Sequence, residues 1–257
     1  MASLLALSCL ATSAALAAEP VAFRPPSVPL VAHDPYFSIW SPADKLTDAD
    51  TVHWTGKPHS LRSLIRIDGV HYRLMGTQPV ETPVLPQTGL KVMPTKTAYS
   101  FACSEVEVTL TFLTPALPDD LDLLSRPVTY VTWDVRSADG KKHQIELYFS
   151  ASSNLAVNTP DQSVVWANEN VPGLLVTRVG SERQPVLSAK GDDRLIDWGY
   201  LYSAAPAEKG VQVGFAASDK ALLQFINEGR LPVEDDNRVP RPVSDEEPVR
   251  ATTFACS

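Results

Sequence analysis

Cysteine and glycine are both scarce in this sequence, which has three cysteines and 12 glycines among 257 residues. The cysteines form no CxxC pair and show no spacing with histidine that is typical of a zinc site. So few glycines leave little material for a phosphate-binding loop, and the sequence contains no Gly-rich nucleotide motif, no GxSxG and no HExxH. We therefore expect no metal ion and no cofactor, and the motifs leave the catalytic residues unknown.

Positive charge is in deficit as well. The 22 lysines and arginines stand against 30 aspartates and glutamates, for a formal net charge of −8, and no basic cluster occurs. A chain without a basic patch is a poor ligand for nucleic acid or for an anionic membrane surface. We expect neither as a partner.

The start of the chain, "MASLLALSCLATSAALAAEP", is typical of an export signal, although no basic residue precedes its apolar run. That run begins at Leu4 and is too short to span a bilayer, and Ala15-Leu16-Ala17 fits the small-x-small cleavage rule. Cys9 would allow lipidation, but Ala6-Leu7-Ser8 before it matches a lipoprotein signal poorly. We expect residues 1–17 to be a signal peptide and the mature protein to be secreted or periplasmic.

Proline is abundant, with 22 residues, against a usual share of about 5%. Because proline cannot donate to a helix or sheet ladder, this favours short strands and many turns. Residues 18–30 form a Pro-rich lead-in, and residues 231–249 are acidic and Pro-rich, typical of an extended loop. The last residues, "RATTFACS", indicate a strand without a following turn. We expect the domain to be cut short there, with an unpaired edge.

Two hairpins are predicted from turn residues and alternation. Asp68-Gly69 is a strong two-residue turn signal, and Ser104-Glu105 forms the second turn. In the second hairpin Cys103 falls on the buried face. The predicted pairs are Ile67–Val70, Arg66–His71, Ile65–Tyr72, Leu64–Arg73 and Ser63–Leu74, then Cys103–Val106, Phe101–Val108 and Tyr99–Leu110.

A third strand pair is expected to turn at residues 137–140, with Val131, Trp133 and Val135 facing inward before it and Ile145, Leu147 and Phe149 after it. Further short strands fit residues 163–167, 174–179, 197–204 and 211–217. A helix from Lys220 to Glu228 would be capped by Ser218 or Asp219 and stopped by Gly229. The pattern predicts an all-β fold, an antiparallel β-sandwich of the supersandwich kind with about a dozen short strands and one short helix.

Histidine and aromatic residues gather between residues 33 and 59. His33-Asp34 fits an orienting pair or a metal site, but Asp before proline favours a turn. His53, Trp54 and His59 could line a pocket with Tyr36 and Trp40, although aromatics that cap a sheet edge are the favoured interpretation. His71, opposite Arg66, is expected on a solvated or interface face.

Acidic residues offer weaker candidates. Asp48 with Asp50, and Asp119, Asp120 and Asp122, have spacings compatible with calcium, but neither set supplies the six or more oxygens that calcium requires. The runs at 234–236 and 245–247 are interpreted as solvated loop charge. Paired carboxylates could serve glycoside hydrolysis, but no pair is favoured.

Several long blocks in order resemble the N-terminal region of the glutaminase A family, over about residues 23 to 226. They are "RPPSVPLVAHDPYFSIWSP", "HWTGKPHSLRSLIRIDGVHYRLMG", "VMPTKTAYSFACSEVEVTLTFLTPALPDDLDLLSRPVTYVTWDVRSADGKKHQIELYFSAS" and "DWGYLYSAAP". The resemblance implies an N-terminal β-sandwich, here residues 31–257, ahead of a helical domain like those of six-hairpin glycosidases. It also implies a small-molecule substrate, since the family hydrolyses L-glutamine to L-glutamate and ammonia.

The helical domain, where catalytic residues would be expected, is absent from these residues. The resemblance therefore predicts a parent hydrolase, a segment that is inactive alone, and a partner in its own C-terminal helical domain. The histidine and aromatic stretch would then pack against that domain. Two alternatives stay open: a glycosidase-like parent acting on carbohydrate, and a carbohydrate-binding module with Trp40, Trp54 or Trp166 as stacking platforms.

Overall fold

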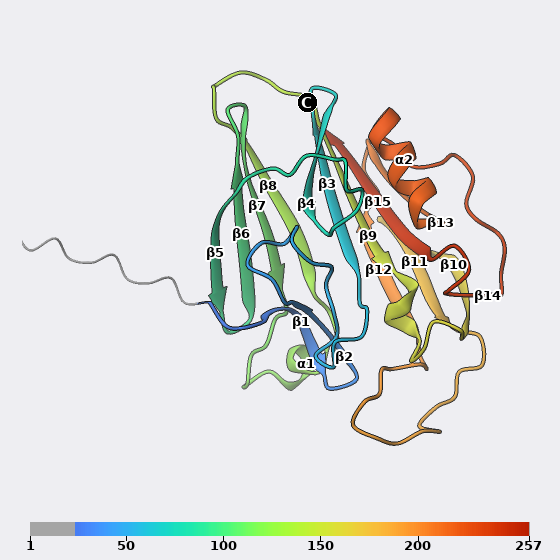
Figure 1. The fold of residues 1–257 in the computed structure, drawn as a ribbon. Helices are drawn as coiled ribbons and strands as arrows, with labels where there is room; N and C mark the ends of the chain where they lie inside the picture. The colour runs from blue at the N-terminus through green and yellow to red at the C-terminus, as the bar shows by residue number, and fades with distance from the viewer. Residues whose placement is uncertain (1–23, 257) are drawn as a thin grey trace, which may run out of the picture.

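The computed structural model describes residues 24–256, which contain 15 strands, two α-helices and one 3-10 helix (Figure 1). The predicted signal peptide and residues 18–23 of the lead-in lie outside the described residues. Every strand pair in the four sheets is antiparallel. The all-β sandwich predicted from the sequence is confirmed.

A five-stranded sheet forms one layer. Its order is β13 (Val211–Ala217), β15 (Pro248–Cys256), β9 (Ile145–Ser152), β3 (Leu61–Ile67) and β4 (Val70–Met75). The β3–β4 hairpin turns at Asp68-Gly69 as predicted, with Gly69 at a φ of 87° that favours glycine. Four of its five predicted pairs are confirmed. The fifth is wrong, because a bulge pairs Ser63 with Met75 rather than with Leu74.

A four-stranded sheet packs on this layer, in the order β5 (Gln87–Met93), β6 (Lys96–Ala102), β7 (Val106–Leu113) and β8 (Tyr130–Ser137). The β6–β7 register is as predicted, with Phe101 opposite Val108 and Tyr99 opposite Leu110. These side chains are at most 1% exposed and meet residues of β3 and β9 in the main core. Cys103 lies at the rim of this core and is half-buried.

The third predicted hairpin is wrong. Strand β8 pairs with β7, whereas β9 pairs with β3 and β15, so residues 138–144 cross from one sheet to the other. The predicted inward residues of both strands do contact the main core. Alternation therefore predicted the buried face of each strand but not its pairing partner, because any strand with one apolar face satisfies the same pattern.

A second four-stranded sheet lies beyond β13, in the order β12 (Leu201–Pro206), β11 (Leu174–Ser181), β10 (Ser163–Val171) and β14 (Arg241–Pro242). Strands β1 (Val28–Asp34) and β2 (Phe37–Ser41) form a small separate sheet. The predicted lead-in thus ends before Val28 rather than at residue 30. The predicted loop at 231–249 contains β14 and the start of β15, which are compatible with proline because Pro242 ends β14 and Pro248 begins β15.

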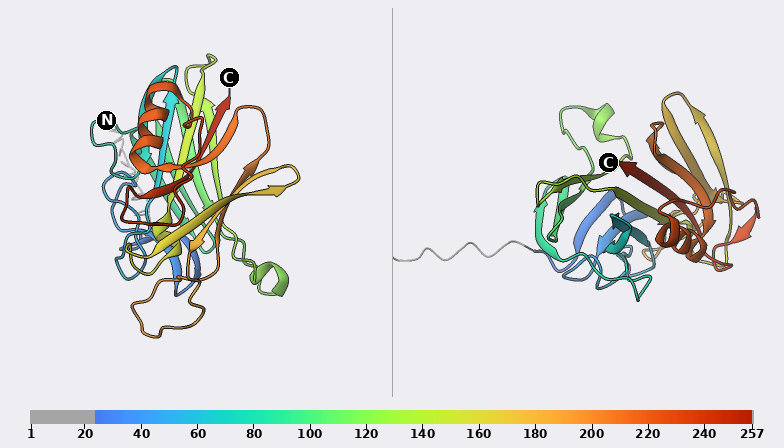
Figure 2. Two further views of the ribbon diagram at one scale, coloured as in Figure 1. Left: turned by 90° about the vertical axis from the view of Figure 1, so that its right-hand side faces the viewer. Right: turned by 90° about the horizontal axis from the view of Figure 1, so that it is seen from above.

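Helix α2 (Ser218–Glu228) covers the outer face of the five-stranded sheet, as both views of Figure 2 show. It stops at Gly229, whose φ of 71° ends the helix as predicted. The predicted cap is wrong, because Ala217 precedes the helix and no side chain of the described residues caps it. Leu222 and Phe225 pack on Leu64 in a second core, so this face of β3 is covered rather than solvated there.

Strand β15 corrects a further expectation. It lies inside the five-stranded sheet and pairs with β13 on one side and β9 on the other, so it is no open edge. Helix α1 (Leu121–Leu124) and the 3-10 helix η1 (Ser153–Ala156) are single turns in loops. No helix within residues 24–256 is long and apolar enough to cross a membrane.

Candidate functional site

The histidine and aromatic residues predicted as a site form one cluster at the start of β3. His53 and His59 lie in the loop before that strand, and both are fully buried. Their rings meet at 5.1 Å, and His53 also contacts Trp54 at 5.6 Å. Phe37 and His33, from the β1–β2 region, continue the chain of ring contacts at 6.0 Å each. The fold thus brings most of the predicted residues together.

Backbone carbonyls, not carboxylates, orient the two buried imidazoles. His59 Nδ1 donates to the Ser38 carbonyl at 2.9 Å, and His53 Nε2 donates to the Pro35 carbonyl at 3.1 Å. His53 Nδ1 therefore accepts from the hydroxyl of Thr55 at 2.9 Å. This threonine–histidine contact is local, and the hydrogen-bond partners of the two rings within the described residues are carbonyls and Thr55 rather than carboxylates.

Burial sets the charge of this cluster. It lowers the pKa of His59 to about 4, and the neighbouring His53 adds to that effect. Burial also lowers the pKa of His53, helped by Lys57. Among the described residues His59 Nε2 has no hydrogen-bond partner, and on protonation it would become an unpaired donor. Both rings are neutral at pH 7 and serve as packed, hydrogen-bonded parts of the loop.

His33-Asp34 forms a turn, the interpretation that the sequence favours. Asp34 Oδ1 accepts from the backbone N–H groups of Tyr36 and Phe37 at 2.7 and 3.1 Å. His33 Nε2 lies 3.2 Å from the hydroxyl of Thr129 and does not contact Asp34. The pair is therefore neither an orienting dyad nor the start of a metal site.

The outer rim of the cluster carries exposed aromatic rings. Tyr36 is 50% exposed and Trp54 is 52% exposed, while Trp54 Nε1 donates to the Pro35 carbonyl at 2.7 Å. Trp40 is half-buried and donates to the Ser38 hydroxyl. The loop that contains Thr129 also carries exposed apolar residues on and around α1, namely Leu117, Leu121, Leu124 and Val128. The favoured interpretation, a rim of aromatics, matches this arrangement.

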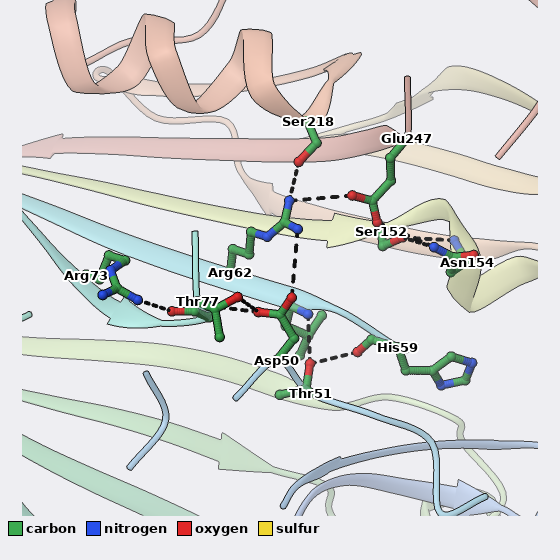
Figure 3. A network of polar contacts seen from close by, with 12 residues as sticks. Asp50, Thr51, His59, Arg62, Arg73, Thr77, Ser152, Asn154, Ser218 and Glu247 are labelled. Atoms are coloured by element: carbon green, nitrogen blue, oxygen red, sulfur yellow. Dashed lines mark hydrogen bonds and ion pairs between the residues drawn. The ribbon is translucent and has the colours of Figure 1, made fainter. Parts of the chain in front are cut away.

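A second polar region surrounds Arg62 on the outer face of β3 (Figure 3). Its side chain is 11% exposed and lies between Asp50, 4.0 Å from Nη2, and Glu247, 3.5 Å from Nη1. Arg62 Nη1 also donates to the hydroxyl of Ser218 at the start of α2. One guanidinium thus joins a loop, a helix and the residue before β15.

Both carboxylates of this network are anchored further. Asp50 accepts from the backbone N–H and the hydroxyl of Thr77 at 2.8 and 2.9 Å. Glu247 accepts from the amide of Asn154 at 3.4 Å. Each carboxylate therefore contacts Arg62 and a second, separate part of the chain. They fix the loops around β3.

The acidic runs predicted as solvated loop charge are partly anchored instead. Asp235 accepts from the Phe215 N–H at 2.9 Å, and Asp236 pairs with Arg238 and Arg241 at 2.7 and 2.9 Å. The Arg238 hydrogen bond holds the pKa of Asp236 well below its usual range. The prediction of solvated charge is therefore wrong for Asp235, Asp236 and Glu247. For Asp236, the nearby Arg238 and Arg241 were the signal in the sequence that its carboxylate would be paired.

Trp166 is not a free stacking platform. It stacks on Phe215 at 5.7 Å, the Arg241 guanidinium lies 5.4 Å from its ring, and Nε1 donates to the Asp236 carbonyl. Two of the candidate calcium residues have other partners: Asp120 caps α1 through the Leu123 N–H at 2.9 Å, and Asp50 is bound to Thr77. Among residues 24–256, no group of three or more His, Cys, Asp or Glu side chains could hold a metal ion.

Sequence reasoning missed a third polar group, at the far end of β3. His143 Nδ1 lies 2.7 Å from Asp68, and Nε2 lies 3.0 Å from Asp139. The hydrogen bond to Asp68, followed by that to Asp139, raises the pKa of His143. Both aspartates precede a turn glycine, which was the only hint that they share one end of the sandwich.

These features define a class of protein, an antiparallel β-sandwich domain. In the part that the structure describes, its polar clusters anchor loops, and one end of the domain carries a rim of exposed aromatic residues. The chain belongs to the family described as domain of unknown function DUF5127, whose model matches residues 95–257. A second model, domain of unknown function DUF4964, matches residues 2–86.

Two curated relatives carry glutaminase names. Glutaminase A of Aspergillus oryzae is 28% identical over 237 residues, which are 89% of this chain and 34% of that protein. A protein of Arthroderma benhamiae named "Probable glutaminase" is 27% identical over 261 residues, 90% of this chain and 28% of that protein. The resemblance to the glutaminase A family is confirmed. The chain spans about a third of the length of these relatives.

Proposed function

We propose that this chain is the N-terminal β-sandwich segment of a secreted or periplasmic glutaminase-like hydrolase, which converts L-glutamine and water to L-glutamate and ammonia. The observation that carries the proposal is the match to glutaminase-named relatives along 89% of this chain but only 34% of the Aspergillus protein. In this proposal the remainder of the parent supplies a helical catalytic domain. The sandwich supports that domain and is inactive alone.

The aromatic rim is the proposed docking surface for the helical domain. Tyr36 and Trp54 are half-exposed, yet they rest on a base fixed by two buried histidines and the Pro35 carbonyl. Rigid aromatic rings on a fixed base lose little side-chain entropy on binding, which is typical of interface anchors.

Activity tests the catalytic part of the proposal. The full product of the natural gene and the 257-residue chain should both be assayed for ammonia release from L-glutamine. We expect release by the full product and background from the chain alone. Sugar release from glycans without ammonia release would instead establish the glycosidase-like alternative, and glycan binding by the isolated chain would favour a carbohydrate-binding module.

Trp54→Ala tests the docking surface. We expect it to lower the melting temperature of the full product more than that of the 257-residue chain, because only the full product buries the ring further. The matched control is Leu223→Ala, an exposed apolar residue at 57% that lies on α2, outside the rim. Equal shifts for Trp54→Ala in both proteins would contradict docking at this rim.

A further inference from the structure

Strand β8 is an open edge of its sheet. It pairs with β7 along its length, and no strand pairs with its other edge within residues 24–256. The eight residues "YVTWDVRS" contain no proline and no lysine, and their ladder with β7 runs without a bulge. Natural edge strands are normally protected by such features, because unpaired N–H and C=O groups template a further strand.

The core beneath β8 is also incompletely covered. Its inward residues Val131, Trp133 and Val135 are half-buried, whereas those of β7 are at most 1% exposed. Trp133 contacts Phe149 at 5.5 Å and Phe254 at 5.9 Å, and both of these rings are half-buried too. An aromatic cluster of three rings therefore remains partly open beside an unpaired strand edge.

A second edge strand borders the same apolar floor. Within the part of the chain that the structure describes, strand β12 pairs with β11 alone, and its Leu201 packs against the main core. On β13, Val211 and Val213 lie opposite Phe254 and Thr252 and are also half-buried. In the right-hand view of Figure 2, β15 lies between the sheet of β5 to β8 and the sheet of β10 to β12.

We propose that an extended strand from the remainder of the parent polypeptide pairs with β8 and covers the Trp133, Phe149 and Phe254 cluster. This inference rests on the proposed function, which supplies the additional chain. The open ladder edge of β8 selects a strand over a helix or a small ligand, because only extended backbone satisfies a row of alternating N–H and C=O groups. The added strand places apolar side chains beside Trp133 and polar ones beside Thr132 and Asp134.

The glutaminase-named relatives make a strand of the same polypeptide the favoured occupant. They extend well beyond the region that matches this chain, which covers 34% and 28% of their lengths. A strand tethered in the same chain pairs at a high effective concentration and needs no separate partner. A second copy of the chain is the competing occupant, and the experiment separates the two.

Amide hydrogen exchange of β8 tests the inference in the 257-residue chain and in the full gene product. The β8 amides that do not bond β7 should exchange freely in the chain and be protected about 100-fold or more in the full product. Strand β5, the other edge of the same sheet, is the internal control and should exchange alike in both. Protection that appears in the chain alone and rises with its concentration would assign the edge to a second copy and overturn the inference.

The variant Val135→Asp places a charge on the inward face of the edge strand, a device that blocks strand addition. It should reduce β8 protection in the full product about tenfold or more, whereas Asp134→Asn on the outward face should not. If the variant does not fold, the wild-type comparison still decides. Equal exchange of β8 in both wild-type proteins, in a product that hydrolyses glutamine, overturns the inference and leaves the proposed function standing. Protection of β8 in a full product that lacks glutaminase activity would support the inference and contradict the proposed function.

Discussion

Histidines lie at both ends of strand β3, and the two ends hold them in contrasting ways. At its start, His59 and His53 are fully buried and donate to backbone carbonyls. At its end, His143 joins Asp68 of the β3–β4 turn to Asp139 of the β8–β9 loop. The side chain of His143 is 9% exposed, but Asp68 is 52% exposed, so water reaches this pair.

The difference shows that the acceptor and its surroundings, rather than burial alone, decide the charge of a histidine. A carbonyl oxygen without a counter-charge cannot offset the desolvation of an imidazolium, so the pKa falls at the start of β3. Two carboxylates favour the cation, so the pKa rises at the end. The first site loses stability as the pH falls, and the second loses it as the pH rises.

The largest expected effect is acid destabilisation through His59. Its folded pKa is about 4 against an ordinary 6.5, so the unfolded chain takes up the proton first as the pH falls. The contribution is fully present above 6.5 and is lost down to about 4, on the order of 3 kcal/mol. Urea unfolding across this range checks it, by comparing wild type with His59→Asn, which keeps a donor for Ser38 but does not titrate. A wild type with no steeper acid loss than the variant would contradict neutral burial.

A smaller loss is expected for His53→Phe at pH 7. The variant removes the donor to the Pro35 carbonyl and the acceptor for Thr55, while Trp54 continues to donate to Pro35. The free energy of unfolding should fall by about 1 kcal/mol. His53→Gln can restore the donor and is the control. An equal loss in both variants would show that packing, not the hydrogen bond, fixes this loop.

Local pattern explains why much of the fold was predictable. The Asp68-Gly69 turn and the alternation around it gave four correct pairs, because both signals lie within one hairpin. The partner of β8 was not predictable in this way. Any strand with one apolar face fits the same interior, so the choice between β9 and β7 depends on the whole sandwich.

The candidate site divides along the same line. The contact between His53 and His59 joins residues six apart, and clustering in the sequence indicated it. Arg62 draws on Asp50, Ser218 and Glu247 from distant parts of the chain, and His143 joins two separate turns. No local pattern records these contacts, because side-chain pairs between loops follow from how the sheets bring the loops together.

The smallest expected effect concerns His143→Gln, which breaks the ionic contacts at the end of β3. The pKa of His143 is raised in the folded state, so its contribution is fully present below the ordinary value of 6.5 and is lost as the pH rises through the raised value. The aspartates have lowered pKa values, so their contribution is lost as the pH falls. We therefore expect the difference in unfolding free energy between wild type and variant to be largest in mildly acidic solution. His71→Gln, on the neighbouring strand β4, is the matched control.

Salt sharpens this last prediction. At about 1 M salt the Debye length is about 3 Å, so contacts between partly exposed charges are weakened while neutral buried contacts are not. The destabilisation caused by His143→Gln should therefore shrink in high salt, and that caused by His53→Phe should not. Urea unfolding of both variants at low and high salt measures the two differences in parallel. A His143→Gln effect that is independent of salt and of pH would mean that the imidazole acts there as a neutral packing group, and the contrast between the two ends of β3 would then be one of geometry rather than of charge.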